Sequence, residues 1–169
     1  MKQISKITIL LFLILNLGCN ASAQERGFAW GAFGSSETIK STVSAIGMSA
    51  NAGYNFNPAI SLFVQTEKKA ILFNKNDEYK SYMLQTLGAL FKLNAYRFNS
   101  GVLDLRASAG SSVFNKDRHL LYFNMGVYLQ ATRDFTKPTI GIGLIKYHSL
   151  KGEAIKHPSL YISIGFTVN

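Results

Sequence analysis

The feature that most constrains the fold is an alternation of apolar and polar residues that recurs along most of the chain. Between Leu121 and Ala131, every second residue is Leu, Phe, Met, Val or Leu, and the residues between them are Tyr, Asn, Gly, Tyr and Gln. Because successive side chains of a β-strand point to opposite faces, this period of two predicts a strand with one apolar face. From residue 27 onward no convincing helical period competes with it.

Eight segments carry this alternation with varying clarity. They span residues 27–33, 42–54, 59–67, 79–93, 102–112, 121–131, 139–147 and 160–169. Imperfect alternation in 42–54 predicts a β-bulge. Residues 79–93 are apolar on both faces in places, so their register stays open. The pattern predicts an all-β protein with eight antiparallel strands.

The connections between these segments alternate in length. Compact turn sequences occupy 55–58, 99–101 and 134–138, whereas 34–41, 68–78, 113–119 and 148–158 are longer and more charged. Short turns on one side and long loops on the other are typical of an up-and-down transmembrane β-barrel of the bacterial outer membrane. An even number of strands then places both termini at the short-turn, periplasmic side.

The composition of the two strand faces favours a membrane barrel over a soluble one. The polar faces carry Ser, Gly, Asn, Gln and Tyr with few charges, whereas a soluble exterior would show more Lys and Glu. Aromatic residues also gather near the segment ends, as in the two interfacial girdles of such barrels. At the expected periplasmic ends these are Phe28, Trp30, Tyr54, Phe56, Phe91, Tyr96, Phe98, Phe135 and Phe166, and at the outer ends Phe73, Tyr79, Tyr82, Phe114, Tyr122 and Tyr147.

The first residues predict export. A nearly continuous apolar stretch of eleven residues, 7–17, follows Lys2 and Lys6, and Ala21-Ser22-Ala23 provides an A-x-A cleavage site. The apolar stretch is shorter than the roughly 20 residues of a transmembrane helix. We therefore expect a cleavable signal peptide at 1–23 and a single domain, the barrel, at 24–169. Cys19 leaves lipidation as an alternative, because Leu17-Gly18 precedes it.

The chain resembles the small eight-stranded outer-membrane β-barrels of the OmpX and OmpA transmembrane-domain type. The resemblance covers residues 24–169 and includes the terminal segment Leu160-Tyr161-Ile162-Ser163-Ile164-Gly165-Phe166, which is similar to the strand that the barrel-assembly machinery recognises. The family usually ends on an aromatic residue, whereas this chain continues through Thr167-Val168-Asn169. The resemblance implies a monomer at the outer membrane that contacts outer-membrane lipid and lipopolysaccharide.

Charge and metal-ligand content exclude several functions. The chain has 18 Lys and Arg against 9 Asp and Glu, but the cations are scattered and the longest run is Lys68-Lys69, so no nucleic-acid site is expected. The chain has three His and no Cys outside the predicted signal peptide, and the spacing of these residues matches no metal site. It also lacks a phosphate-binding Gly loop, so we expect no cofactor.

Eight strands enclose an interior that side chains just fill, so we expect no open pore. Asp104 and Arg106 share one strand face, and Glu67 is expected to point inward. We hypothesise that Arg106 pairs with Asp104 or Glu67 and braces the lumen. A structural or surface-interaction role follows from this architecture.

The alternative function is an enzyme that resembles lipid A deacylases, which use a Ser nucleophile and a His base on one strand face. His148 and Ser149 are adjacent and therefore point to opposite faces, while His157 and Ser159 have the right spacing but flank Pro158. We therefore expect no enzyme. A third expectation is that Lys68 and Lys69, at the start of a charged loop, face lipopolysaccharide phosphates.

Overall fold

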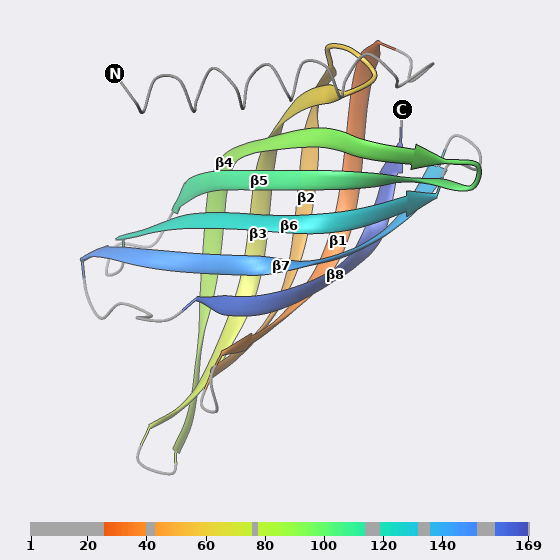
Figure 1. The fold of residues 1–169 in the computed structure, drawn as a ribbon. Coiled ribbons are helices and arrows are strands. Elements are labelled where there is room, and N and C mark those ends of the chain that lie inside the picture. Colours follow the sequence, from red (N-terminus) through yellow and green to blue (C-terminus); the bar gives the residue numbers. More distant parts are fainter. Residues whose placement is uncertain are drawn as a thin grey trace, which may run out of the picture.

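The computed structural model describes residues 26–39, 43–75, 78–113, 119–131, 136–151 and 158–168. They form a closed barrel in which each strand pairs antiparallel with the next and the last pairs with the first (Figure 1). The strands are β1 (Gly27–Ile39), β2 (Val43–Asn55), β3 (Ile60–Lys75), β4 (Glu78–Phe98), β5 (Gly101–Ser112), β6 (His119–Ala131), β7 (Thr136–Lys151) and β8 (Ser159–Val168). The predicted eight-stranded up-and-down barrel is confirmed.

Some expectations concern residues outside this description. The predicted signal peptide with Cys19 lies outside the described residues, and so does His157. In the part of the chain that is described, no helix is long and apolar enough to cross a membrane.

The short turns lie at one end of the barrel. In the turn after β2, the Asn57 side-chain oxygen accepts hydrogen bonds from the backbone N–H groups of Ala59 and Ile60, both at 2.8 Å. The turn after β4 consists of Asn99 and Ser100 alone. Figure 1 shows this end together with the C-terminal end of β8. The ends of β1, β3, β5 and β7 point to the opposite end, called here the long-loop end because the two longest connections, β5 to β6 and β7 to β8, lie there.

Four strands run farther than the sequence pattern predicts, and one of them is β7, which covers Thr136–Lys151 instead of 139–147. Residues 34–39 continue β1, and the expected loop 68–78 is a hairpin in which β3 and β4 pair as far as Lys75 and Glu78. In Figure 1 this hairpin projects beyond its neighbours. Ladder hydrogen bonds use only backbone groups, so charged side chains do not end the pairing. These loop predictions were therefore wrong in their boundaries.

The expected bulge in 42–54 is also wrong. The pairing of β2 with β1 and β3 runs from Val43 to Asn55 without a register shift. Shifts occur instead at Ala95 of β4, between Asn94 and Tyr96, and at Leu150 of β7, opposite His119 and Leu120. A bulge bends a strand locally, and the first of these lies next to the tight turn into β5.

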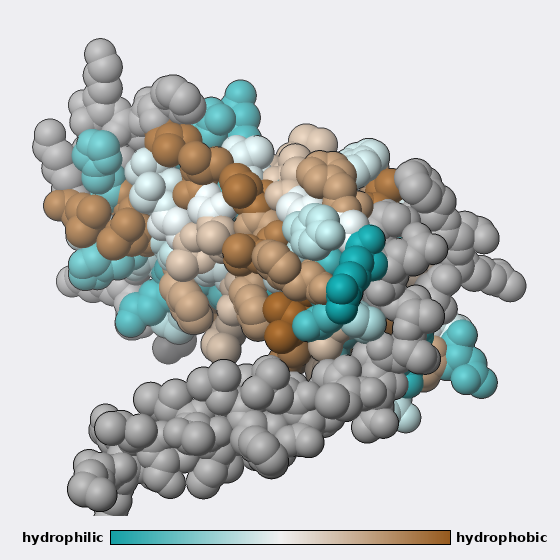
Figure 2. Space-filling model, turned by 90° about the horizontal axis from the view of Figure 1, so that it is seen from above, coloured by the Kyte–Doolittle hydropathy of each residue, from teal (hydrophilic) through white to brown (hydrophobic). Residues whose placement is uncertain are grey.

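The barrel turns its apolar side chains outward and its polar side chains inward. On β7 and β8 the outward residues Ile140, Ile142, Ile162 and Ile164 are each at least half exposed. The buried set includes charged and amide side chains from several strands. On the face seen in Figure 2, strongly hydrophilic residues lie mainly toward the ends of the described part. The apolar surface is thus an outer belt, and the core is a polar lumen.

The structure resolves the register that the sequence left open in β4. Leu84, Thr86, Leu90 and Lys92 are buried in the lumen, whereas Gln85, Leu87, Ala89 and Phe91 are exposed on the outer face. Near the short-turn end, aromatic side chains are exposed on the outer wall, as expected; they include Phe28, Trp30, Tyr54, Phe56, Phe91, Tyr96 and Phe98.

Three residues of the expected outer aromatic girdle lie on the inward side instead, and one of them, Tyr82, is partly buried against the lumen cluster. Tyr122 and Tyr147 are buried in the lumen. Each lies at an inward position of its strand, because the neighbours of Tyr122 on β6 and of Tyr147 on β7 are exposed.

Candidate functional site

Tyrosine rings lying over glycines fill much of the lumen. Tyr161 is paired with Gly143, which is paired with Gly126 on the next strand. A methyl group at Gly143 would lie 2.3 Å from the Met125 carbonyl oxygen and 2.6 Å from the Tyr161 hydroxyl. The two glycines therefore leave the space that the ring occupies.

The same arrangement recurs one strand pair away. Tyr122 is paired with Gly110, which is paired with Gly88. A methyl group at Gly88 would lie 2.3 Å from the Tyr122 hydroxyl. Tyr128 covers Gly141 in a similar way and shares a 2.9 Å hydrogen bond with the Tyr161 hydroxyl. Side chains thus close the inside of the barrel.

One ion-pair cluster lies in the lumen toward the long-loop end, and we call it the Lys69 cluster (Glu37, Glu67, Lys69 and Tyr147). The Lys69 ammonium pairs with Glu37 and with Glu67, the latter at 3.0 Å, and donates to the Tyr147 hydroxyl at 2.8 Å. The Tyr147 hydroxyl donates to Glu37 at 3.0 Å, and the Ser35 hydroxyl donates to Glu67 at 3.1 Å. The cluster joins β1, β3 and β7 across the lumen.

A second cluster lies toward the short-turn end, and we call it the Arg106 cluster (Lys92, Asp104, Arg106 and Gln130). The Arg106 guanidinium donates to an Asp104 carboxylate oxygen at 2.9 Å, and the same oxygen lies 3.7 Å from the Lys92 ammonium. Lys92 also donates to Gln130 at 3.0 Å. The guanidinium carbon is 4.2 Å from the centre of the Tyr128 ring, a cation–π contact.

The two clusters carry opposite charge excesses. The Lys69 cluster contains two carboxylates and one ammonium, whereas the Arg106 cluster contains two cations and one carboxylate. The formal charges of the two clusters therefore sum to zero. Every charged member is buried, so each one depends on the others for compensation.

The structure places the predicted lumen residues inside the barrel but assigns their partners differently. Arg106 contacts Asp104, and Glu67 contacts Lys69 instead of Arg106. Lys69 is buried, so its expected lipopolysaccharide-facing position was wrong, while Lys68 is exposed on the outer wall. The period of two in a strand already predicts this difference, since Glu67 and Lys69 share one face and Lys68 lies on the other.

Replacing Arg106 by alanine is expected to lower the free energy of unfolding by about 1.5–3 kcal/mol, the range for a hydrogen bond to a charged group. Asp104 would keep only the more distant Lys92 as a cationic partner. Urea unfolding in detergent micelles measures the change, with Arg26→Ala at the exposed residue before β1 as the control, expected within about 0.5 kcal/mol. Equal effects of the two changes would remove the bracing role.

The structure does not bring together the candidate catalytic residues that it describes, which are His148, Ser149 and Ser159. His148 is exposed on the outer wall, while Ser149, the next residue of β7, is half-buried on the other face. Ser159 is buried at the start of β8. A nucleophile and its base need hydrogen-bond contact, and these residues lie on different sides of the barrel wall. Among the described residues, no group of His, Cys, Asp or Glu side chains could hold a metal ion.

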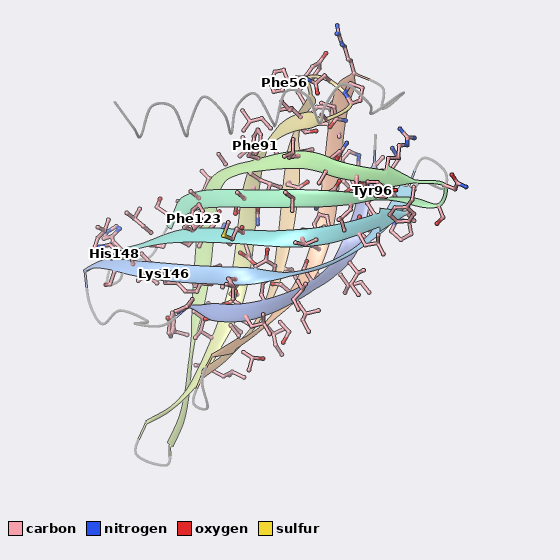
Figure 3. The ribbon with its side chains drawn as sticks, in the orientation of Figure 1. Phe56, Phe91, Tyr96, Phe123, Lys146 and His148 are labelled. Carbon is pink, nitrogen blue, oxygen red and sulfur yellow. The ribbon has the colours of Figure 1, made fainter. Side chains whose placement is uncertain are left out.

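The outer wall carries one further feature, which we call the β5 groove. It has a volume of about 610 Å³ and lies over β4, β5, β6 and β7. Ala109, Gly110 and Ser111 of β5 form its floor, and larger residues of β4 and β6 flank it. Lys146 and His148 of β7 line the same groove. Figure 3 shows both beside Phe123, at the end of the barrel opposite Tyr96.

Comparisons with known proteins add no identity to this geometry. The chain matches no protein-family model, and a search of curated proteins finds no significant similarity.

Proposed function

We propose that the protein is a small outer-membrane β-barrel with a side-chain-filled lumen, which has a structural or surface-interaction role and no open pore. The observation that carries this proposal is the polarity of the wall. Large apolar side chains are exposed on every strand of a closed barrel, and the buried charges lie inside it. Hydrocarbon solvates such a belt, and closure leaves no unpaired strand edge in it.

The filled lumen supports the absence of a pore. Two ion-pair clusters and the tyrosines over their glycines occupy the interior of an eight-stranded barrel, which side chains are able to fill. We therefore expect the barrel reconstituted in planar bilayers to give no stable single-channel current.

The direction of the barrel follows from its two ends. In barrels of this class the short turns face the periplasm and the long loops face outward. The long-loop end, with Lys146 and His148 on its outer wall, would then meet lipopolysaccharide, and β8 would be the strand that the assembly machinery engages. The resemblance to small outer-membrane barrels and the predicted signal peptide support the same location, and we propose a monomer.

An arginine in the outer belt tests the membrane location. In lipid vesicles, Ile142→Arg is expected to lower the free energy of unfolding by about 2–4 kcal/mol, because it places a charge at the hydrocarbon midplane. The matched control is Leu150→Arg on the same strand and face, beyond Lys146 and His148, where we expect a loss of about 0–1 kcal/mol. Both target residues are at least half exposed, so packing losses are similar.

The measurement is urea unfolding of the protein in vesicles. The folded fraction is read from the mobility difference between unheated and heated samples on gels. Equal effects of the two arginines, or a wild-type chain that folds in buffer and does not associate with vesicles, would contradict the proposal.

A further inference from the structure

We propose that the β5 groove binds one molecule of a phosphorylated outer-leaflet glycolipid of the lipid A class, with an acyl chain over Ala109 and a phosphate at Lys146 and His148. The inference rests on the proposed function, because it requires this wall to lie in the outer leaflet. It goes beyond that function by assigning a specific binding site and its ligand.

The shape of the groove comes from the strand register. On the outer face, Leu87, Ser111, Leu121 and His148 form one row across β4 to β7. Phe123 of β6 belongs to the next row, toward the middle of the barrel. Because the β5 residues are small and their neighbours are large, the wall is hollowed along one strand. Strands lie about 4.7–4.9 Å apart, so the flanking strands leave a channel roughly 9–10 Å across between their axes.

In the next row the outward side chains of β4 and β5 are at their smallest. Ala89 and Ala109 lie side by side on β4 and β5, followed by Phe123 and Lys146 on β6 and β7. All four face outward and are exposed. The groove volume of about 610 Å³ falls within the range of about 300–1,000 Å³ that small-molecule sites occupy. An extended hydrocarbon chain lying over the two alanines would contact Phe123 along its length.

The charge of the groove is confined to one end. Toward the middle of the barrel, the outward residues of β7 are Ile140, Ile142 and Leu144, all about half exposed. Lys146 and His148 follow directly on the same face. An ammonium group and an imidazole at the edge of an apolar belt match the phosphate of an amphiphile whose chains enter the belt. The described residues that line the groove include no carboxylate.

The polar and apolar parts together select a lipid over a soluble anion. A free phosphate would use only Lys146 and His148 and leave the hollow over β5 without an occupant. The Ser111 hydroxyl, in the same row as His148, offers a further hydrogen-bond partner for the head group. The long-loop end is the outward end of the proposed topology, where the phosphorylated lipid is lipid A.

Native mass spectrometry of the folded barrel in a neutral detergent tests the site, with diphosphorylated lipid A as the probe. Lys146→Gln/His148→Gln is expected to lower the apparent affinity at least about tenfold, the loss of one charge-assisted hydrogen bond. Ala109→Phe fills the floor and is expected to lower it similarly. The matched controls are Ala50→Phe and Lys68→Gln, which alter exposed outward positions outside the groove and should change it less than twofold.

Further arms identify the ligand. Dephosphorylated lipid A should bind as weakly to the wild type as lipid A does to the double variant, and excess inorganic phosphate should not displace lipid A. If Lys68→Gln and the double variant lost affinity equally, lipid A would be attracted to the outer wall in general, and the proposed binding in the β5 groove would be overturned. Equal binding of phosphatidylglycerol would overturn the choice of lipid A. Gel mobility of unheated samples checks the folding of each variant, so failure of the barrel is distinguished from failure of the site.

Discussion

Replacing Lys69 by methionine is expected to lower the free energy of unfolding by about 3–5 kcal/mol, the cost of removing one partner from a buried ion pair. Lys69 is the cation that faces both Glu37 and Glu67, and its side chain is only about 3% exposed. Without it, two buried carboxylates remain, and the Tyr147 hydroxyl is the nearest donor to one of them. Urea unfolding in detergent micelles measures the loss.

The neighbouring lysine provides the control. Lys68→Met changes the same residue type one position away, on the exposed outer wall, and should stay within about 0.5 kcal/mol. A triple variant, Lys69→Met with Glu37→Gln and Glu67→Gln, removes the stranded charges and should recover more than half of the loss. Equal effects of Lys68→Met and Lys69→Met would show that the cluster contributes nothing to stability.

Gly143→Ala is expected to destabilise the barrel by about 3 kcal/mol, the upper end of the usual range for overpacking. The added methyl group would lie 2.3 Å from the Met125 carbonyl oxygen, which is backbone and cannot move aside without disturbing the β6–β7 ladder. It would also lie 2.6 Å from the Tyr161 hydroxyl, so the ring that fills this part of the lumen would have to shift.

Gly34→Ala is the matched control for this change. A methyl group at Gly34 meets only the Ile164 carbonyl oxygen, at 3.9 Å, within 4 Å. The change should therefore be neutral or stabilise the protein by about 0.4–1 kcal/mol, because alanine restricts the unfolded chain more than glycine does. Comparing the two variants by thermal or urea unfolding separates the close contact from the general effect of losing a glycine. A Gly143→Ala barrel as stable as Gly34→Ala would contradict the proposed ring packing.

The strands could be predicted because a barrel wall with one apolar face leaves a period of two in the sequence. Leu121, Phe123 and Met125 of β6 and Ile162 and Ile164 of β8 all face outward as that period requires. The ends of the strands could not be predicted, because charged residues such as Lys68 continue the backbone ladder without interrupting it.

The lumen contacts could be predicted only in part. Asp104 and Arg106 lie two residues apart on one strand, so their pairing is local and visible in the sequence. The partners of Lys69 are not, because which strands face each other across a barrel depends on strand tilt and stagger. The β5 groove was missed for a related reason, since its floor becomes a hollow only when three neighbouring strands are in register.

The Lys69 cluster also affects the order of folding events. Glu37 and Tyr147 are 110 residues apart, and their strands come together only when β8 closes the barrel against β1. Bringing such distant segments together costs loop-closure entropy, so we infer that the contact forms after most hairpins have paired. Interactions that form this late slow unfolding more than they speed folding. The buried lysine would thus act chiefly on the lifetime of the closed barrel, holding its first and seventh strands together against reopening of the seam.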